Sequence, residues 1–225
     1  MTRNNAKQDT PVCPVGESSC EWLAEIVRLR AEVSQLSALV ATDPVTGLFN
    51  YRHFKQVLQT EMDRSKRSSI PTSLVLADID HFKSFNEQHG HEAGNLMLKQ
   101  IADICRGELR TTDTVCRYVG EVIAIIFPET HLNLAAKVAD RIREEIAATP
   151  IVLESGEFNV TVSMGASVYV KTSVIDQVDF IDSVDRFLHE AKQSGRNCIC
   201  HIDFSELRSV TEIGAPERVM RIARD

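Results

Sequence analysis

The feature that most constrains the fold is a pair of apolar runs, at 115–119 and 122–127, that flank Gly120 and Glu121. Both runs contain strand-forming residues, and a two-residue connection that contains glycine is typical of a β-hairpin. A hairpin joins antiparallel neighbours, whereas parallel strands need long crossover connections. The sequence therefore predicts an antiparallel pair of strands with one acid, Glu121, at its tip.

The rest of the chain carries helical and strand patterns in an order that favours an α+β fold. Strands and helices do not alternate strictly, so a doubly wound parallel sheet fits poorly. We expect a mostly antiparallel central sheet flanked by helices, as in the palm of polymerases and cyclases, preceded by an N-terminal helix. The predicted domain helices cover 52–66, 82–88, 92–109, 131–148 and 178–195, and the further strands cover 72–79, 158–170 and 196–204.

The sequence predicts four parts along the chain. Residues 1–19 form a polar, disordered leader, 20–42 a coiled-coil-like helix, 43–204 the domain, and 205–225 a tail with a last helix. The 4-3-4-3-4 spacing of apolar residues in 20–42 is that of a coiled-coil seam and predicts a homodimer. An amphipathic helix packed on its own domain is the alternative. The seam consists of Trp22, Ile26, Leu29, Val33, Leu36 and Val40.

Charge and hydropathy argue against several classes of function. The 225 residues carry a formal net charge of −7, so nucleic acids and membranes are poor partners, and an anionic ligand needs local basic groups. No apolar run reaches the roughly 18 to 20 residues of a membrane span, and the polar start lacks the apolar core of a secretory signal. We expect a cytoplasmic protein. The six cysteines lack C-x2-C spacing, which favours reduced structural thiols over a zinc site.

A few polar residues could carry chemistry beside the hairpin. Asp78, near the end of the strand 72–79, could hold Mg2+ together with Glu121, because this ion prefers oxygen ligands and is commonly shared with phosphates. Asn86 offers both a donor and an acceptor, as guanine recognition requires. Taken singly, each of these is more commonly a solvated surface residue. Three basic residues could meet phosphates: Lys83, Lys192 and Arg196.

Several stretches together resemble the GGDEF family, the diguanylate cyclase domains that condense two GTP into cyclic di-GMP. They are DPVTGLFNYRHF, DIDHFKSFNEQHGHEAGN, RYVGEVIAIIFPET, VTVSMGAS and AKQSGRN, in that order and at the family's spacings. The resemblance implies the cyclase palm fold, and Mg2+ if the GTP site functions. It assigns Asp78 and Glu121 to the metal, Asp80 to the structure, Asn86 and Asn95 to guanine, and Lys83, Lys192 and Arg196 to phosphates.

The hairpin departs from the family motif at three of five positions. The family has Gly-Gly-Asp/Glu-Glu-Phe, whereas residues 119–123 read VGEVI. Val119 neither adopts a positive φ easily nor lets GTP lie against bare backbone. Val122 replaces a carboxylate, and an isopropyl group can neither bind Mg2+ nor accept a proton. Asn95 stands where the family has Asp, and its single acceptor oxygen mispairs with the N1–H and N2–H of guanine.

A second motif, RTTD at 110–113, lies five residues before VGEVI, where the family carries its R-x-x-D inhibitory site for cyclic di-GMP. Arg110 can present a forked donor to guanine O6 and N7, and Asp113 can accept from N1–H and N2–H. A local salt bridge between the two is the alternative. The resemblance adds Arg141, on the helix after the hairpin, to this site.

Three functions are left open by the sequence. The first is a degenerate, catalytically inactive GGDEF domain that acts as a cyclic di-GMP receptor through its R-x-x-D motif and needs no cofactor. The second is a diguanylate cyclase that tolerates the variant motif and uses Mg2+. The third is a nucleotide-free domain that binds an unknown protein partner.

Overall fold

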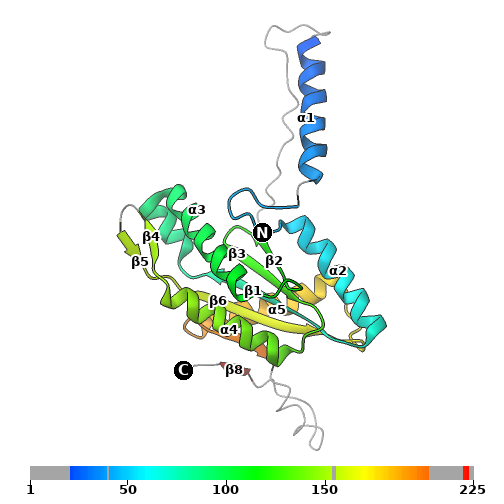
Figure 1. Cartoon of the computed structure of the whole chain (residues 1–225), viewed down its shortest axis with the longest axis vertical. Helices are drawn as coiled ribbons and strands as arrows, with labels where there is room; N and C mark the ends of the chain where they lie inside the picture. The colour runs from blue at the N-terminus through cyan, green and yellow to red at the C-terminus, as the bar shows by residue number, and fades with distance from the viewer. Residues whose placement is uncertain (1–20, 40, 154–155, 203–219, 223–225) are drawn as a thin grey trace, which may run out of the picture. The chain divides into compact units, whose positions relative to one another are not determined.

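A computed structural model describes residues 21–39, 41–153, 156–202 and 220–222. The chain forms two compact units, Met1–Ala41 and Thr42–Asp225. The first contains helix α1 (Glu21–Leu39), and the second contains the sheet and the other helices (Figure 1). The predicted leader, 1–19, and most of the predicted tail lie outside the described residues. Among the described helices, none combines the length and the apolar character that a membrane crossing needs.

A six-stranded sheet forms the centre of the second unit. Its strand order is β2-β3-β1-β6-β7-β8, and every neighbouring pair is antiparallel except β6 with β7. The mostly antiparallel sheet confirms the predicted α+β class. Its strands are β1 (Thr72–Ile79), β2 (Thr114–Val119), β3 (Val122–Phe127), β6 (Val162–Tyr169), β7 (Ile199–Ile202) and β8 (Met220–Ile222).

Helices cover both faces of this sheet (Figure 1). Strand β1 is buried along its whole length, and its side chains alternate between the two faces. Val75 and Ala77 belong to a core with α3 and α4, whereas Leu74 and Leu76 belong to a core with α2 and α5. Burial on both faces explains why β1 reads as a nearly continuous apolar run. The helices are α2 (Tyr51–Ser68), α3 (Phe82–Glu108), α4 (Leu132–Ala148) and α5 (Gln177–Gln193).

Gly90 breaks α3 where the sequence predicts an interruption. Its φ of 84° and ψ of 162° are non-helical, so the element consists of two helical parts joined by a kink. Glycine reaches this backbone conformation without the steric cost that a Cβ would add. The kink separates the part of α3 that carries Lys83 and Asn86 from the part that carries Asn95.

Two details of the fold differ from the prediction. The strand predicted at 158–170 is present as β6 but begins only at Val162, and an unpredicted small hairpin of β4 (Ile151–Leu153) and β5 (Gly156–Phe158) precedes it. Strands of three residues are too short to show a periodic pattern, which is why the sequence does not reveal them. In the tail, 220–222 pair with β7 as a strand, where a helix was expected.

The described cysteines behave as structural thiols, as predicted. Cys105, Cys116, Cys198 and Cys200 are buried and form no disulfide. Burial raises the pKa of the Cys105 thiol to about 12. A thiol that stays protonated at neutral pH is a poor nucleophile and a poor metal ligand.

Candidate functional site

The candidate catalytic site lies where the end of β1 meets the β2–β3 hairpin. Asp78 is in register with Val122 of β3 on one side and with Ser163 of β6 on the other. Residues directly opposite each other in antiparallel strands project from the same face of the sheet. The position at which the family motif has a carboxylate is therefore a direct neighbour of Asp78, and here it carries an isopropyl group.

Asp78 is buried and paired with a cation from the same chain. Its Oδ2 lies 2.7 Å from Nζ of Lys192, near the end of α5. Burial raises the pKa of Asp78, the hydrogen bond and charge of Lys192 lower it in part, and the charges of Glu121 and Asp80 raise it further. The tertiary structure thus brings Asp78, Glu121 and Lys192 together from three separate elements.

These residues leave few protein ligands for Mg2+. Mg2+ takes an octahedron of oxygen ligands, several of them commonly water. Asp78 gives one carboxylate oxygen to Lys192, and Val122 offers no ligand. In the part of the chain that the structure describes, no group of three or more His, Cys, Asp and Glu side chains could hold a metal ion.

Asp80 has the structural role that the resemblance implies. Its Oδ1 accepts from Ser163 Oγ at 2.7 Å, and its Oδ2 accepts from Thr161 Oγ1 at 2.6 Å. Oδ2 also accepts from the backbone N–H of Asn197 at 3.2 Å. Asn197 and Arg196 both adopt positive φ, 44° and 64°, which is uncommon for residues other than glycine. Asp80 therefore helps to hold a strained loop that leaves Arg196 exposed.

The hairpin tip corrects one part of the argument about Val119. The positive φ, 58°, belongs to Gly120, which the chain retains, and Val119 is not among the residues with positive φ. Backbone strain at Val119 is therefore not a defect of this site. The Val119 side chain is nevertheless 63% exposed at the tip, where the family has bare backbone, so it would still crowd a bound nucleotide.

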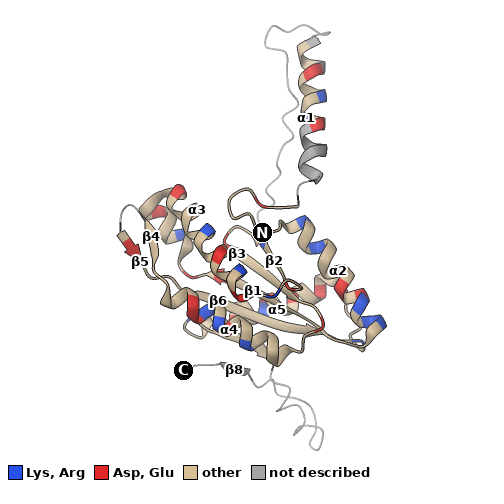
Figure 2. Cartoon of the chain, in the orientation of Figure 1, with Lys and Arg blue, Asp and Glu red and all other residues tan. Residues whose placement is uncertain are grey.

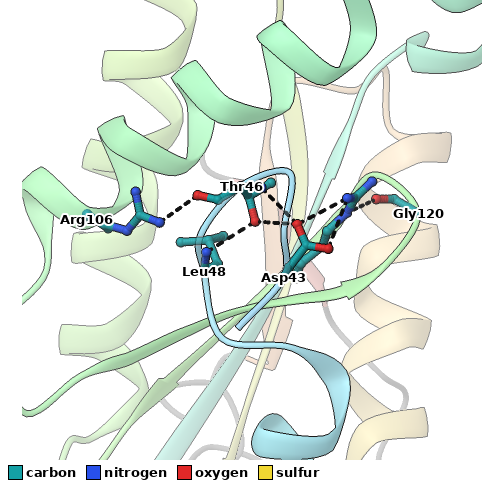
Figure 3. A network of polar contacts seen from close by, with 6 residues as sticks. Asp43, Thr46, Leu48, Arg106 and Gly120 are labelled. Carbon is teal, nitrogen blue, oxygen red and sulfur yellow. Dashed lines mark hydrogen bonds and ion pairs between the residues drawn. The ribbon is translucent and has the colours of Figure 1, made fainter. Parts of the chain in front are cut away.

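A polar network fastens this tip to the segment before α2 (Figure 3). Arg117 donates through Nε to the carbonyl oxygen of Gly120 at 2.8 Å and through Nη1 to both carboxylate oxygens of Asp43 at 3.2 Å. Asp43 Oδ1 also accepts from the backbone N–H of Thr46 at 2.9 Å and from its hydroxyl at 2.8 Å. Burial raises the pKa of Asp43, but the bonds from Thr46 and the charge of Arg117 outweigh it and hold the pKa below its ordinary value.

Sequence reasoning missed this network. An Asp followed by Thr three residues later in DPVTG is a recognisable turn signal, because Asp side chains bond to nearby backbone N–H groups. The sequence does not reveal that Arg117 closes the network, or that Arg106 Nη2 donates to Thr46 O at 2.6 Å. Phe49 adds backbone hydrogen bonds to the edge of β2, so the segment is fixed along that strand.

The predicted guanine and phosphate contacts on α3 make no direct hydrogen bond or ion pair with Asp78 within the described residues, and Lys83 Nζ lies 3.9 Å from the Glu87 carboxylate. Asn86 Oδ1 is buried without a partner, and a Cβ on Gly94 would lie 1.9 Å from it. An unpaired buried acceptor costs about 1–3 kcal/mol, so this oxygen could accept from a ligand. Asn95 is exposed.

The R-x-x-D motif forms a turn immediately after α3. The backbone N–H of Arg110 donates to Asp113 Oδ2 at 3.0 Å, and the backbone N–H of Asp113 donates to Arg110 O at 3.1 Å. Asp113 is thus held by the backbone of Arg110, and the guanidinium makes no ion pair with it among the described contacts. Burial raises the pKa of Asp113, while the Arg110 N–H and the Arg110 charge lower it in part.

Arg141, on α4, contacts the end of α3 just before the R-x-x-D turn. Its Nη2 donates to the backbone oxygen of Glu108 at 2.9 Å, and its Nε pairs with the Glu108 carboxylate. Glu108 is the last residue of α3, two positions before Arg110. Figure 2 shows both signs of charge on α4, the helix that supplies Arg141. We call Arg110, Asp113 and Arg141 the R-x-x-D site, with Glu108 as its acidic neighbour.

Comparisons with known proteins agree with this geometry. Residues 40–198 match the family described as "Diguanylate cyclase, GGDEF domain". The "Uncharacterized protein YhcK" of Bacillus subtilis is 35% identical over 167 residues, which are 73% of this chain and 45% of that protein. The "Response regulator PleD" of Caulobacter vibrioides is 33% identical over 173 residues, which are 76% of this chain and 38% of that protein. This chain thus spans less than half the length of either relative.

A solved structure has the same architecture. It is the crystal structure of the coiled coil and GGDEF domain of DgcB from Caulobacter crescentus in complex with c-di-GMP, with a TM-score of 0.69 and 26% identity. The similarity covers 79% of this chain and 94% of that one. The family match covers most of the residues and the sheet has the fold of this relative, so the chain belongs to the GGDEF family of diguanylate cyclase domains.

Proposed function

We propose that this chain is a GGDEF domain that receives cyclic di-GMP at its R-x-x-D site and does not make the ligand itself. The observation that carries the proposal is the arrangement after α3. The Arg110 guanidinium is not engaged by Asp113, while Arg141 from α4 is held on the same segment. Two cations and a partly buried acid are thereby gathered at one place on a chain of net charge −7.

The chemistry of these side chains suits a dianion that carries guanine bases. Arg110 supplies a planar fork that matches guanine O6 and N7 and also attracts the phosphates. Asp113 can accept from the N1–H and N2–H of the same base. The structure of DgcB with c-di-GMP supports the ligand class, because it belongs to a relative with the same fold.

Loss of synthesis is supported by the residues around Asp78. Val122 removes a carboxylate beside Asp78, Lys192 binds the remaining acid, and the exposed Val119 crowds the tip. Removing one charged group from a preorganised site typically lowers the rate by about 10²-fold or more. Asn95 adds a mismatch with guanine.

Two other functions are each favoured by one specific observation. An active cyclase is favoured by the proximity of Asp78 and Glu121, two acids that could share Mg2+ with GTP phosphates. A protein-binding domain without nucleotide is favoured by α1, where Trp22, Ile26 and Leu29 are exposed.

We further propose that α1 forms a homodimer through this apolar seam. Three of its six predicted positions are exposed, and the others belong to side chains that the structure does not describe. About two and a half heptads dimerise weakly when alone, so the helix would assist another contact. Light scattering of the full chain and of a version starting at Ala41 should show a lower mass for the shorter chain. Equal masses would contradict the dimer.

The experiment that separates the three functions uses the full chain. Calorimetry with cyclic di-GMP should show binding, and incubation with GTP and Mg2+ followed by product chromatography should show no cyclic di-GMP. Product formation would establish the cyclase. Absence of heat up to high micromolar cyclic di-GMP, together with absence of product, would leave the interaction domain.

A further inference from the structure

The ion pair between Asp78 and Lys192 is not needed for the proposed receptor function. Its two side chains are 10% and 36% exposed, and 2.7 Å separates Oδ2 from Nζ. Asp78 lies between β3 and β6 in the sheet, so solvent provides little compensation for its charge. A buried carboxylate without a cation is strongly destabilising. In this domain, Lys192 supplies that cation.

The packing of α5 on β6 determines where the ammonium lies. A Cβ on Gly165 would come within 2.2 Å of Leu188 N and 2.4 Å of Val184 O, so glycine permits the helix to approach the strand this closely. Lys192 is in the last turn of α5, four residues after Leu188, where the helix dipole favours a positive charge. The close approach therefore places the Lys192 ammonium near the start of β6, beside Asp78.

The neighbouring groups leave few oxygens for a second cation. Asp80 already accepts three hydrogen bonds, from Ser163, Thr161 and the backbone of Asn197. Val122, directly opposite Asp78, has no oxygen in its side chain. Only Glu121 has no hydrogen bond or ion pair among the described contacts while lying close enough to influence Asp78.

We propose that Lys192 is the resident cation of this site, so that Asp78 is neutralised from within the chain and does not bind a divalent metal ion. A metal ion would have to displace a paired ammonium and then complete its coordination shell beside Val122. Mg2+ gives up its water reluctantly, so it is poorly suited to this exchange. The Asp78–Lys192 pair joins β1 and α5, whereas the R-x-x-D site follows α3. Failure of cyclic di-GMP binding would therefore leave this proposal about metal binding untouched.

Mn2+ binding to the full chain, measured by paramagnetic resonance of the free ion, tests the proposal. Wild type should bind no more Mn2+ than Asp78→Asn. The double variant Val122→Glu with Lys192→Met restores an acid and removes the ammonium, and should bind Mn2+ at least about tenfold more tightly than wild type. The matched control combines Val122→Glu with Lys83→Met, which removes an exposed lysine on α3, and should gain less.

Two results would overturn the proposal. One is Mn2+ binding by wild type that Asp78→Asn abolishes, and the other is a folded double variant with wild-type Mn2+ affinity. Thermal unfolding provides a second readout that does not depend on the double variant. Lys192→Met should melt about 5 °C or more below wild type, because the Asp78 carboxylate loses its cation. Unchanged melting of Lys192→Met would likewise refute the role of its ammonium.

Discussion

The two charged sites of this domain differ in how far their charges are already satisfied. At the end of β1, Asp78 is bound by Lys192, and Asp80 accepts three hydrogen bonds. After α3, Arg110 makes no ion pair with Asp113 among the described contacts. Arg141 pairs with Glu108 at the surface. The first site is closed by internal partners, whereas the second keeps its cations near solvent.

This difference indicates which charged motif residues can still bind a ligand. A buried charge must have a partner inside the protein, so an acid that has lost its ligand is kept only if another group neutralises it. An exposed cation carries no such requirement, because water solvates it until a ligand arrives. Under the proposed function, the buried motif acids of the Asp78 site therefore stabilise the fold, while the exposed Arg110 can still meet a ligand.

The largest expected effect comes from restoring the family's residues around the Asp78 site. The triple variant Val119→Gly, Val122→Glu, Asn95→Asp should bind GTP more tightly than wild type and form detectable cyclic di-GMP, because it restores bare backbone, an acid and a guanine acceptor. Ile123 remains a departure from the motif. Chromatography of the products measures the rate, and tight binding of Mg-GTP by wild type would contradict the comparison.

The next largest expected effect concerns the R-x-x-D site. Arg110→Ala removes a charge and a bidentate fork worth about 1–3 kcal/mol, so affinity for cyclic di-GMP should fall roughly 5- to 150-fold in calorimetry. Arg110→Lys should be nearly as damaging, because an ammonium lacks the planar fork. Arg67→Ala, a basic residue in the last turn of α2, removes the same charge elsewhere and should bind like wild type. Wild-type affinity of Arg110→Ala would end the receptor proposal.

The third expected effect concerns the Asp43 network, which holds the hairpin tip next to the Asp78 site. Asp43→Asn removes charged hydrogen bonds to Thr46 and Arg117 and should cost about 1–3 kcal/mol of unfolding free energy at pH 7. The folded pKa of Asp43 lies below its ordinary value, so its contribution is present above about pH 4 and is lost as pH falls through the folded pKa.

Urea denaturation at several pH values measures this contribution. The gap between wild type and Asp43→Asn should be widest near neutral pH and should narrow as the pH falls below about 4. A gap that stays constant with pH would show that the Asp43 carboxylate charge is not what holds the hairpin tip.

The smallest expected effect concerns Glu108, the acidic neighbour of the R-x-x-D site. Glu108 holds Arg141 and places a negative charge near an anionic ligand, so Glu108→Gln should raise affinity for cyclic di-GMP about three- to tenfold. Asp103→Asn, an earlier acid on α3 paired with Arg106, makes the same change in net charge and serves as the control. Equal gains in both variants would point to net charge alone rather than to release of Arg141.

Much of the fold can be predicted from the sequence because its signals are local. The strand 72–79, the hairpin and the break at Gly90 each follow from a few adjacent residues. The β4–β5 hairpin and β8 could not be predicted, because strands of three residues form only where the rest of the fold offers them a partner. Among the site residues, the sequence predicted that Asp78 lies near the hairpin, but not its register with Val122 or its ion pair with Lys192.

The sequence by itself determined the family, the α+β class and the replacement of a motif acid by Val122, since these depend on residue identity and spacing. Only the tertiary structure decided which charged side chains pair with each other. Asp78 with Lys192, Asp43 with Arg117 and Glu108 with Arg141 are each joined across elements that are distant in the chain. Pairing of charges depends on distance and burial, which the packing of helices on the sheet creates and which no local pattern encodes.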